Sequence, residues 1–141
     1  MYLDTAYVAK CYLNEPDAAA VRRLVAGRSD LTSSAFCLAE LACVVQRHVR
    51  ERGLTRAQAT RLRRLFDEDV RDGVWTLLPI SAPLLSEVQR RVAALPPSVY
   101  VRAGDALHLV SASEAGHAEV WTNDRHMLAA ASHLGVRGRS V

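Results

Sequence analysis

Short strand-like segments alternate with longer segments of helical periodicity along this chain of 141 residues. Parallel strands cannot be joined by a tight turn and need a helical crossover, so the alternation favours an α/β domain with a short, mostly parallel central sheet. The pattern also allows antiparallel strands at the edges of the sheet. Strands are expected at residues 1–3, 30–33, 75–79 and 119–122 and in the tail after Gly135, and helices at 6–13, 17–26, 35–52, 55–72, from Ser81 to before Pro96, from Val101 to Gly116, and at 124–134.

Three helix ends carry specific local signals. Thr55 and Gln58 have the spacing of a capping box, in which each side chain accepts a hydrogen bond from the other residue's free backbone amide. Ser81 is suited to cap the next helix, with Pro83 in its first turn. Gly135 is typical of the position just beyond a helix C-terminus.

Composition and length indicate a single domain over residues 1–141. Half of the residues are hydrophobic, and no Pro-, Gly- or Ser-rich tract divides the chain. Cys11, Cys37 and Cys43 lie in apolar surroundings without the spacing of a zinc or redox motif, so we expect reduced core residues. Neither a signal peptide nor a span of about 18 uncharged residues is present, which predicts a cytoplasmic protein without membrane association.

The positive charge of the chain comes almost entirely from arginine. Of 18 basic residues only Lys10 is a lysine, the net charge is +3, and the pI is near 9.0. Seven arginines, whose guanidinium groups suit phosphates, lie between residues 47 and 64. Such a run is usually the solvated face of a helical hairpin, and we favour that interpretation over contact with a nucleic acid.

Four acidic residues occupy unusual places. Asp4 and Asp124 each follow a predicted strand, and in open α/β sheets functional sites lie beyond the C-terminal ends of the strands. Asp105 and Glu40 are single carboxylates in the otherwise apolar helical stretches VRAGDALHLVSA and AFCLAELACVV. Because an unpaired carboxylate is costly to bury, each needs a partner. We expect the four acids to converge at one edge of the sheet.

Each acid also has a local explanation. Asp4 and Asp124 can cap the helices that follow them, and Asp105 can interact with the dipole of its own helix. Glu40 can pair with an arginine such as Arg47. These explanations treat each residue separately and do not explain why all four acids can converge.

A divalent cation is the simplest way to hold four carboxylates together, since at short range they repel one another. Mg²⁺ and Mn²⁺ prefer oxygen ligands and can activate a water for attack on a phosphodiester. Histidine and cysteine are not placed as in a zinc site. His108 lies one helical turn from Asp105, but a histidine among apolar neighbours is more often a packed core residue.

Four short motifs follow one another in the sequence: Tyr2-Leu3-Asp4-Thr5, Ala39-Glu40-Leu41, Asp105-Ala106-Leu107-His108-Leu109 and Thr122-Asn123-Asp124. In this order and spacing the chain resembles the PIN-domain nucleases, and most closely the VapC-type toxins of bacterial toxin–antitoxin pairs, over essentially its whole length. The resemblance implies a three-layer α/β/α domain and a Mg²⁺- or Mn²⁺-dependent endoribonuclease. The residues that it implies for the metal site are the acids Asp4, Glu40, Asp105 and Asp124, with the hydroxyl residues Thr5 and Thr122 beside them.

The same resemblance implies protein partners. Family members usually form homodimers and are inhibited by a small cognate antitoxin, whose C-terminal segment lies across the toxin's groove and often presents a basic side chain to the acids. The pair commonly represses its own promoter, with the antitoxin making the contact to DNA.

The expected reaction is hydrolysis of an RNA phosphodiester by water activated at one or two metal ions, with Glu40 as a ligand or as the residue that orients the water. Arg102 and Arg125 would hold the RNA backbone. Two alternatives stay open. A phosphatase with an aspartate nucleophile after its first strand needs a second acid two residues later, where this chain has Ala6. A non-catalytic RNA-binding or regulatory scaffold, in which the acids only cap helices, would have no acid-dependent metal site.

Overall fold

The computed structural model describes all residues 1–141, and it contains the predicted alternation of strands and helices. The strands are β1 (Tyr2–Leu3), β2 (Leu31–Ser34), β3 (Trp75–Leu78), β4 (Glu119–Trp121) and β5 (Arg137–Arg139). The helices are α1 (Thr5–Tyr12), α2 (Ala18–Val25), α3 (Cys37–Arg50), α4 (Arg56–Arg71), α5 (Ala82–Ala93), α6 (Ala103–Glu114) and α7 (Arg125–Ala130). Each predicted element is present, with ends that differ by a few residues from those expected.

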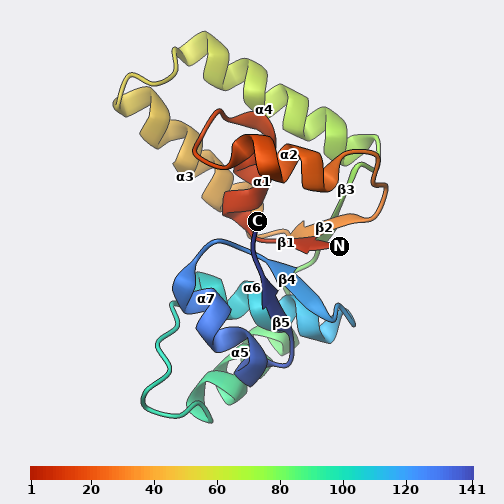
Figure 1. Ribbon diagram of the computed structural model, residues 1–141, viewed down its shortest axis with the longest axis vertical. Helices are drawn as coiled ribbons and strands as arrows, with labels where there is room; N and C mark the ends of the chain where they lie inside the picture. The colour runs from red at the N-terminus through yellow and green to blue at the C-terminus, as the bar shows by residue number, and fades with distance from the viewer.

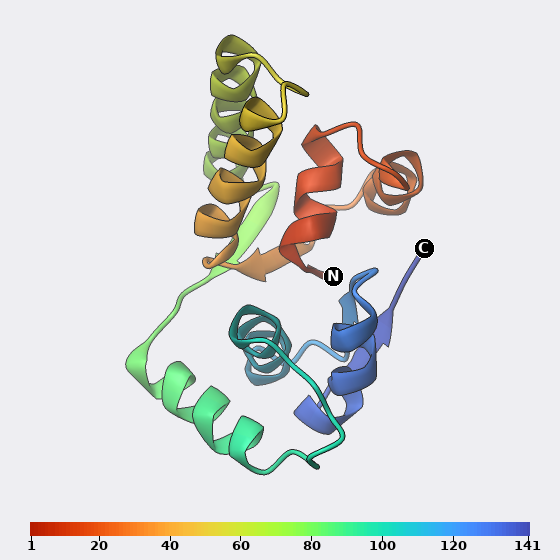
Figure 2. The same ribbon diagram turned by 90° about the vertical axis from the view of Figure 1, so that its left-hand side faces the viewer.

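The strands form one parallel sheet in the order β3-β2-β1-β4-β5, with β1 at its centre. The tail strand β5 also pairs in parallel with β4, so the sheet has no antiparallel edge. Helices α1 to α4 cover one face of the sheet, and α5, α6 and α7 cover the other (Figures 1 and 2). The fold is therefore the expected three-layer α/β/α arrangement.

The two-residue strand β1 contributes to the core on both faces of the sheet. Side chains of successive strand residues point to opposite faces, so Leu3 packs with α1 to α4 while Tyr2 packs with α6 and α7. The neighbouring strand β4 repeats this alternation, because Tyr2 pairs with Val120 and Leu3 with Trp121. A strand in the centre of the sheet is thus held from both sides, and the residue that follows it, Asp4, has a well-defined position.

The predicted helix ends are confirmed at three positions. Thr55 and Gln58 form the capping box, and the Ser81 hydroxyl accepts a hydrogen bond from the Leu84 amide at 3.2 Å. Gly135 adopts a φ of 90°, where a Cβ atom would lie 2.7 Å from the Ser113 hydroxyl oxygen. The helix predicted over 124–134 differs, because α7 ends at Ala130 and the chain tightens into a 3₁₀ turn, η1 (Ala131–Leu134), before this glycine.

The three cysteines do not all lie in the core. Cys37 is buried and Cys11 is partly buried, but Cys43 is exposed on α3, so the prediction for Cys43 was wrong. In α3 the side that faces the core consists of Cys37, Leu41 and Val45, and Cys43 lies on the exposed side together with its neighbour Ala42. All three are free thiols, and no helix of the chain has the length and apolar character needed to cross a membrane.

The arginine-rich segment is solvent-exposed, as predicted. It forms the end of α3, the connection to α4, and the first half of α4, which together make the long hairpin in Figure 1. Some of these arginines pair with neighbouring acids on the surface, as Arg64 does with Glu68 at 3.6 Å. The hairpin therefore carries a solvated cationic face.

Candidate active site

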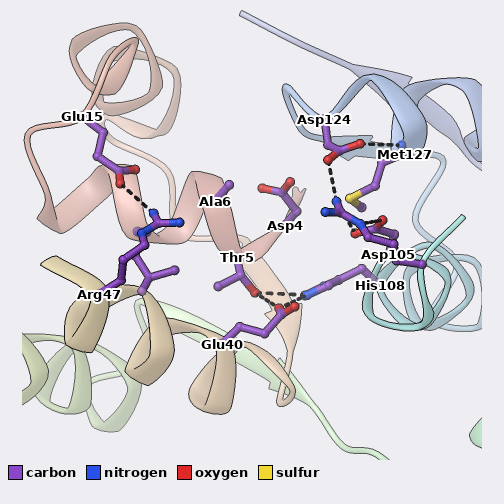
Figure 3. Close-up of a pocket in the computed structure, with 13 residues that line it drawn as sticks. Asp4, Thr5, Ala6, Glu15, Glu40, Arg47, Asp105, His108, Asp124 and Met127 are labelled. Atoms are coloured by element: carbon purple, nitrogen blue, oxygen red, sulfur yellow. Dashed lines mark hydrogen bonds and ion pairs between the residues drawn. The ribbon is translucent and has the colours of Figure 1, made fainter. Parts of the chain in front are cut away.

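A cavity of about 240 Å³ opens beyond the C-terminal ends of β1 and β4. Side chains from the starts of α1, α3, α6 and α7 line it, so segments that are far apart in the sequence meet there (Figure 3). The four predicted acids Asp4, Glu40, Asp105 and Asp124 all belong to its lining, as does Thr5. The expected convergence at one edge of the sheet is present.

Asp4 lies at the centre of this cavity, between Glu40 on one side and Asp124 on the other (Figure 3). It is the N-cap of α1, and its Oδ1 accepts a hydrogen bond from the Tyr7 amide at 2.8 Å. Only 4% of the residue is exposed. Burial raises the pKa of the Asp4 carboxyl above its ordinary value, although the hydrogen bond from Tyr7 acts in the opposite direction. A negative charge at this position therefore gains from a nearby cation.

Glu40 is held by a threonine and a histidine. Its Oε2 accepts hydrogen bonds from the Thr5 hydroxyl and from Nε2 of His108, the latter at 2.9 Å. Burial acts to raise the pKa of Glu40, but the hydrogen bonds from His108 and Thr5 outweigh it and hold the pKa below its ordinary value. The alternative pairing of Glu40 with Arg47 is wrong, since Arg47 lies 3.7 Å from Glu15 instead.

The partner of Asp105 is Arg102, which precedes α6. Arg102 Nε lies 2.7 Å from Asp105 Oδ2, and Nη2 lies 3.2 Å from Asp105 Oδ1. The same Nη2 donates to Asp124 Oδ2 at 2.6 Å, so one guanidinium bridges two of the predicted acids. Asp105 and then Asp124 raise the pKa of Arg102 above its ordinary value. The guanidinium group of Arg102 therefore points inward, toward these two acids.

Asp124 is the N-cap of α7, as the local explanation predicted. Its Oδ1 accepts hydrogen bonds from the amides of His126 at 2.7 Å and Met127 at 3.1 Å, while Oδ2 faces Arg102. Burial acts to raise the pKa of Asp124, but these amides and the charge of Arg102 hold it below its ordinary value. The capping explanations for Asp4 and Asp124 are both confirmed. Each cap uses only one of the two carboxylate oxygens, so capping leaves the second oxygen of the same carboxylate able to have another role.

The remaining predicted residues lie around the cavity. Thr122 is fully buried, and its hydroxyl accepts a hydrogen bond from the Asp124 amide at 2.9 Å, which fixes the turn after β4. Asn123 bridges the hydroxyl of Tyr7 (2.6 Å) and the carboxylate of Asp17 (3.2 Å), and so ties this turn to α1 and α2. Arg125 is exposed at the start of α7 and does not line the cavity.

Sequence reasoning missed two charged members of the lining and underrated a histidine. Arg47 and Glu15 line the cavity as an ion pair, and His108 lines it with only 2% of its surface exposed. The spacing of Arg47, seven residues after Glu40, does place both on one face of α3 and was the available signal. No sequence signal indicated Glu15, since its contact depends on how the α1–α2 connection packs on α3.

The model of the PIN domain family matches residues 1–133 of the chain. The chain is a member of the PIN domain family. PIN domains are nucleases that generally depend on divalent metals such as Mg²⁺. No curated protein matches the chain. In this PIN domain, acidic side chains from separate segments of the chain come together in the cavity described above.

The acidic side chains of this PIN-domain cavity suit a hard divalent cation by their chemistry, but they do not form an assembled metal site. Asp4, Asp105 and Asp124 offer carboxylate oxygens, which Mg²⁺ and Mn²⁺ prefer. In the present arrangement no group of three or more His, Cys, Asp or Glu side chains is close enough to hold a metal ion, and Arg102 occupies the space between two of the acids. The guanidinium shows that these carboxylates attract a cation, and its withdrawal would leave them without a counter-charge.

Proposed function

We propose that this PIN domain is a Mg²⁺- or Mn²⁺-dependent endoribonuclease whose active site is the cavity at the ends of β1 and β4. A single observation supports the proposal most strongly: four carboxylates from α1, α3, α6 and α7 line one cavity of about 240 Å³ together with Thr5 and His108. Local helix capping accounts for contacts of Asp4 and Asp124 but not for this convergence.

The proposed roles follow from the contacts of each side chain. Asp4, Asp105 and Asp124 would hold the cation, which when bound would supply Lewis-acid stabilisation of the charge that develops on the phosphate. Glu40 completes the acidic set. Its Oε2 is occupied by Thr5 and His108, so Oε1 is the oxygen that can orient the attacking water and accept its proton. The water oxygen forms a new bond to phosphorus and its proton passes to Oε1 of Glu40, while one phosphate ester bond breaks and the leaving ribose oxygen takes up a proton from solvent. The net reaction is hydrolysis of the RNA backbone.

Arginines at the cavity supply contacts to the RNA backbone in this proposal. Arg47 lines the cavity and is about half exposed, and Arg102 has 55% of its side chain exposed. Guanidinium groups bind phosphate through paired N–H donors. Arg125, exposed at the start of α7 and outside the cavity lining, is the third proposed contact. Together they offset the repulsion that the acids exert on RNA.

Cleavage of total RNA tests the enzymatic proposal. The purified protein should cleave RNA with Mn²⁺ or Mg²⁺ and lose this activity with EDTA, and Asp4→Asn should lose it while its circular dichroism spectrum stays that of the wild type. Asp67→Asn is the matched control, because Asp67 is an exposed aspartate on α4 without an ion pair. Undiminished cleavage by Asp4→Asn would contradict the proposed site.

The proposed biological role is that of a toxin paired with a small antitoxin. The supporting observations are the order of the four VapC-like motifs and the chemistry of the surface around the cavity. A basic partner segment would complement the acids, and α3, which carries Glu40, exposes Leu38 (48% exposed) for apolar contact with such a segment. The proposed free form is a homodimer, and DNA contact would come only through the antitoxin.

Growth of bacteria that express the gene tests this role. Expression of the wild-type chain alone should arrest growth, Asp4→Asn should not, and co-expression of a small adjacent reading frame with a basic C-terminal segment should relieve the arrest. Sedimentation of the purified protein should give twice the 15.5 kDa of one chain. Normal growth during strong expression of soluble protein would contradict the toxin role.

A non-catalytic RNA-binding or regulatory scaffold is the second candidate, and specific contacts favour it. Asp4 and Asp124 both cap helices, and Arg102 already neutralises Asp105 and Asp124. Calorimetric titration with Mn²⁺ separates the two functions, since a scaffold should bind no ion through these acids. An Mn²⁺ site that disappears in Asp4→Asn would exclude the scaffold.

A further inference from the structure

A chain of buried hydrogen bonds connects the central strand to Glu40. Tyr2, in β1, is fully buried, and its hydroxyl lies 2.9 Å from Nδ1 of His108. His108, in α6, is 2% exposed, and its Nε2 lies 2.9 Å from Oε2 of Glu40. These two hydrogen bonds join residues that are 106 and 68 positions apart in the sequence. The hydrogen-bond chain leads from the core on one face of the sheet into the cavity.

The donors and acceptors of this chain select one tautomer of the His108 ring. Oε2 of Glu40 accepts the hydrogen of the Thr5 hydroxyl, and an ionised carboxylate can only accept, so Nε2 of His108, 2.9 Å away, is a donor and carries a hydrogen. A neutral ring with its hydrogen on Nε2 has Nδ1 as an acceptor, so the Tyr2 hydroxyl, 2.9 Å away, is the donor to Nδ1. The order is therefore Tyr2 O–H to Nδ1, then Nε2–H to Glu40.

These contacts leave the two oxygens of Glu40 unequal. Oε2 receives both donors, Thr5 and His108, whereas Oε1 takes part in no hydrogen bond within the chain. Oε1 also lies close to the backbone of α6, since a Cβ atom at Gly104 would be 3.0 Å from it. A side chain at position 104 would press on this oxygen. The surroundings thus fix both the rotation of the carboxylate and the oxygen that stays free.

We propose that His108, oriented by the hydroxyl of Tyr2, is a positioning residue that presents Oε1 of Glu40 to the reacting water. This inference rests on the proposed nuclease function, in which Glu40 orients the water. His108 touches neither substrate nor cation in this role and acts only through Glu40. Partners that orient a metal-site residue in this way commonly contribute about 10- to 100-fold to activity.

Variants of Tyr2 and His108 test the proposal by steady-state cleavage of a fluorescent RNA hairpin with Mn²⁺. Tyr2→Phe removes only the hydroxyl and should lower kcat by about 10-fold or more with little change in KM. His108→Leu should lower kcat further, and His108→Gln, whose amide can both accept and donate, should restore part of the loss. Tyr12→Phe is the matched control, because Tyr12 is hydrogen-bonded to Asp69 and Trp75 on the other face of the sheet. Thermal unfolding identifies any variant that fails to fold.

The ring nitrogens of His108 supply a readout that does not depend on activity. The ¹⁵N spectrum of the metal-free wild type should show the Nε2–H tautomer, assigned by its absence in His108→Gln, and Tyr2→Phe should mix the two tautomers. A ring with hydrogen on Nδ1 alone, or unchanged kcat in both Tyr2→Phe and His108→Leu, would overturn the inference. A wild-type protein that cleaves no RNA would overturn the proposed function instead, and the ring spectrum would then decide whether the Tyr2–His108 pairing itself is correct.

Discussion

Replacement of Arg102 by glutamine should increase the affinity of the protein for Mn²⁺. In the metal-free state the guanidinium bridges Asp105 and Asp124, with N–O distances of 2.7 and 2.6 Å, so a cation that binds these acids must displace it. Arg102→Gln removes this internal competitor. The Asp105 and Asp124 side chains are 13% and 29% exposed, whereas that of Arg102 is 55% exposed and well screened by solvent.

The expected gain follows from the strength of these ion pairs. Partly exposed pairs contribute at most about 1 kcal/mol each, so the two together contribute up to about 2 kcal/mol, which corresponds to a gain of up to about 30-fold in affinity. Isothermal titration calorimetry at low ionic strength measures the change, and added salt should reduce it. The same variant should bind RNA more weakly, because a phosphate contact is lost.

Arg47→Gln is the matched control for this experiment. It removes the same charge from the same cavity, but Arg47 pairs with Glu15 and not with the acids of the proposed metal site. Its affinity for Mn²⁺ should stay close to that of the wild type. The reasoning is refuted if Arg102→Gln binds Mn²⁺ no more tightly than the wild type, or if Arg47→Gln gains as much.

Three further variants probe the same cavity. Burial raises the pKa of the Asp4 carboxyl in the folded state, so the folded protein binds a proton at Asp4 more readily than the unfolded chain and loses stability as the pH rises. Asp4→Asn should therefore raise the Tm of the metal-free protein at pH 7. The difference in Tm between variant and wild type should fade below pH 3.8, the ordinary pKa of the group. Arg47→Gln should weaken RNA binding and reduce its salt dependence in filter-binding titrations, and an unchanged salt slope would contradict a phosphate contact. Gly104→Ala places a Cβ atom 3.0 Å from Oε1 of Glu40, so cleavage of RNA should fall. The Tm should change by less than about 5 °C, because alanine stabilises a helix by about 1 kcal/mol relative to glycine and so offsets the close contact. Wild-type cleavage by Gly104→Ala would show that Glu40 has room to move.

Most of the fold could be predicted because its signals are local. The capping residues Thr55 and Ser81 and the glycine at 135 act within a few residues of their positions, and the apolar periodicity of each helix depends only on its own segment. The parallel sheet follows from the alternation of strands and helices. Where a local signal was ambiguous the prediction failed, as at Cys43, which belongs to an apolar stretch but lies on the exposed side of α3, while Leu41 and Val45 face the core.

The candidate site could be predicted as a set of residues but not as a set of contacts. Asp4 and Asp124 follow strands of one parallel sheet, which places them at one edge by topology alone. The partner of Glu40 could not be read in the same way. Arg47 has the right charge and helical spacing, yet it pairs with Glu15, while Glu40 receives hydrogen bonds from Thr5 and His108.

The amino-acid sequence by itself determined the order of the elements, the layer arrangement and the edge of the sheet where the acids gather, because these depend on short-range periodicity and on the geometry of parallel strands. Only the tertiary structure decided that Arg102 joins Asp105 to Asp124 and that Tyr2 reaches Glu40 through His108. Hydrogen bonds and ion pairs depend on separations of a few ångströms between side chains from different elements. Spacing along one element places a side chain on a face, and the packing of several elements then selects which of the available partners it meets.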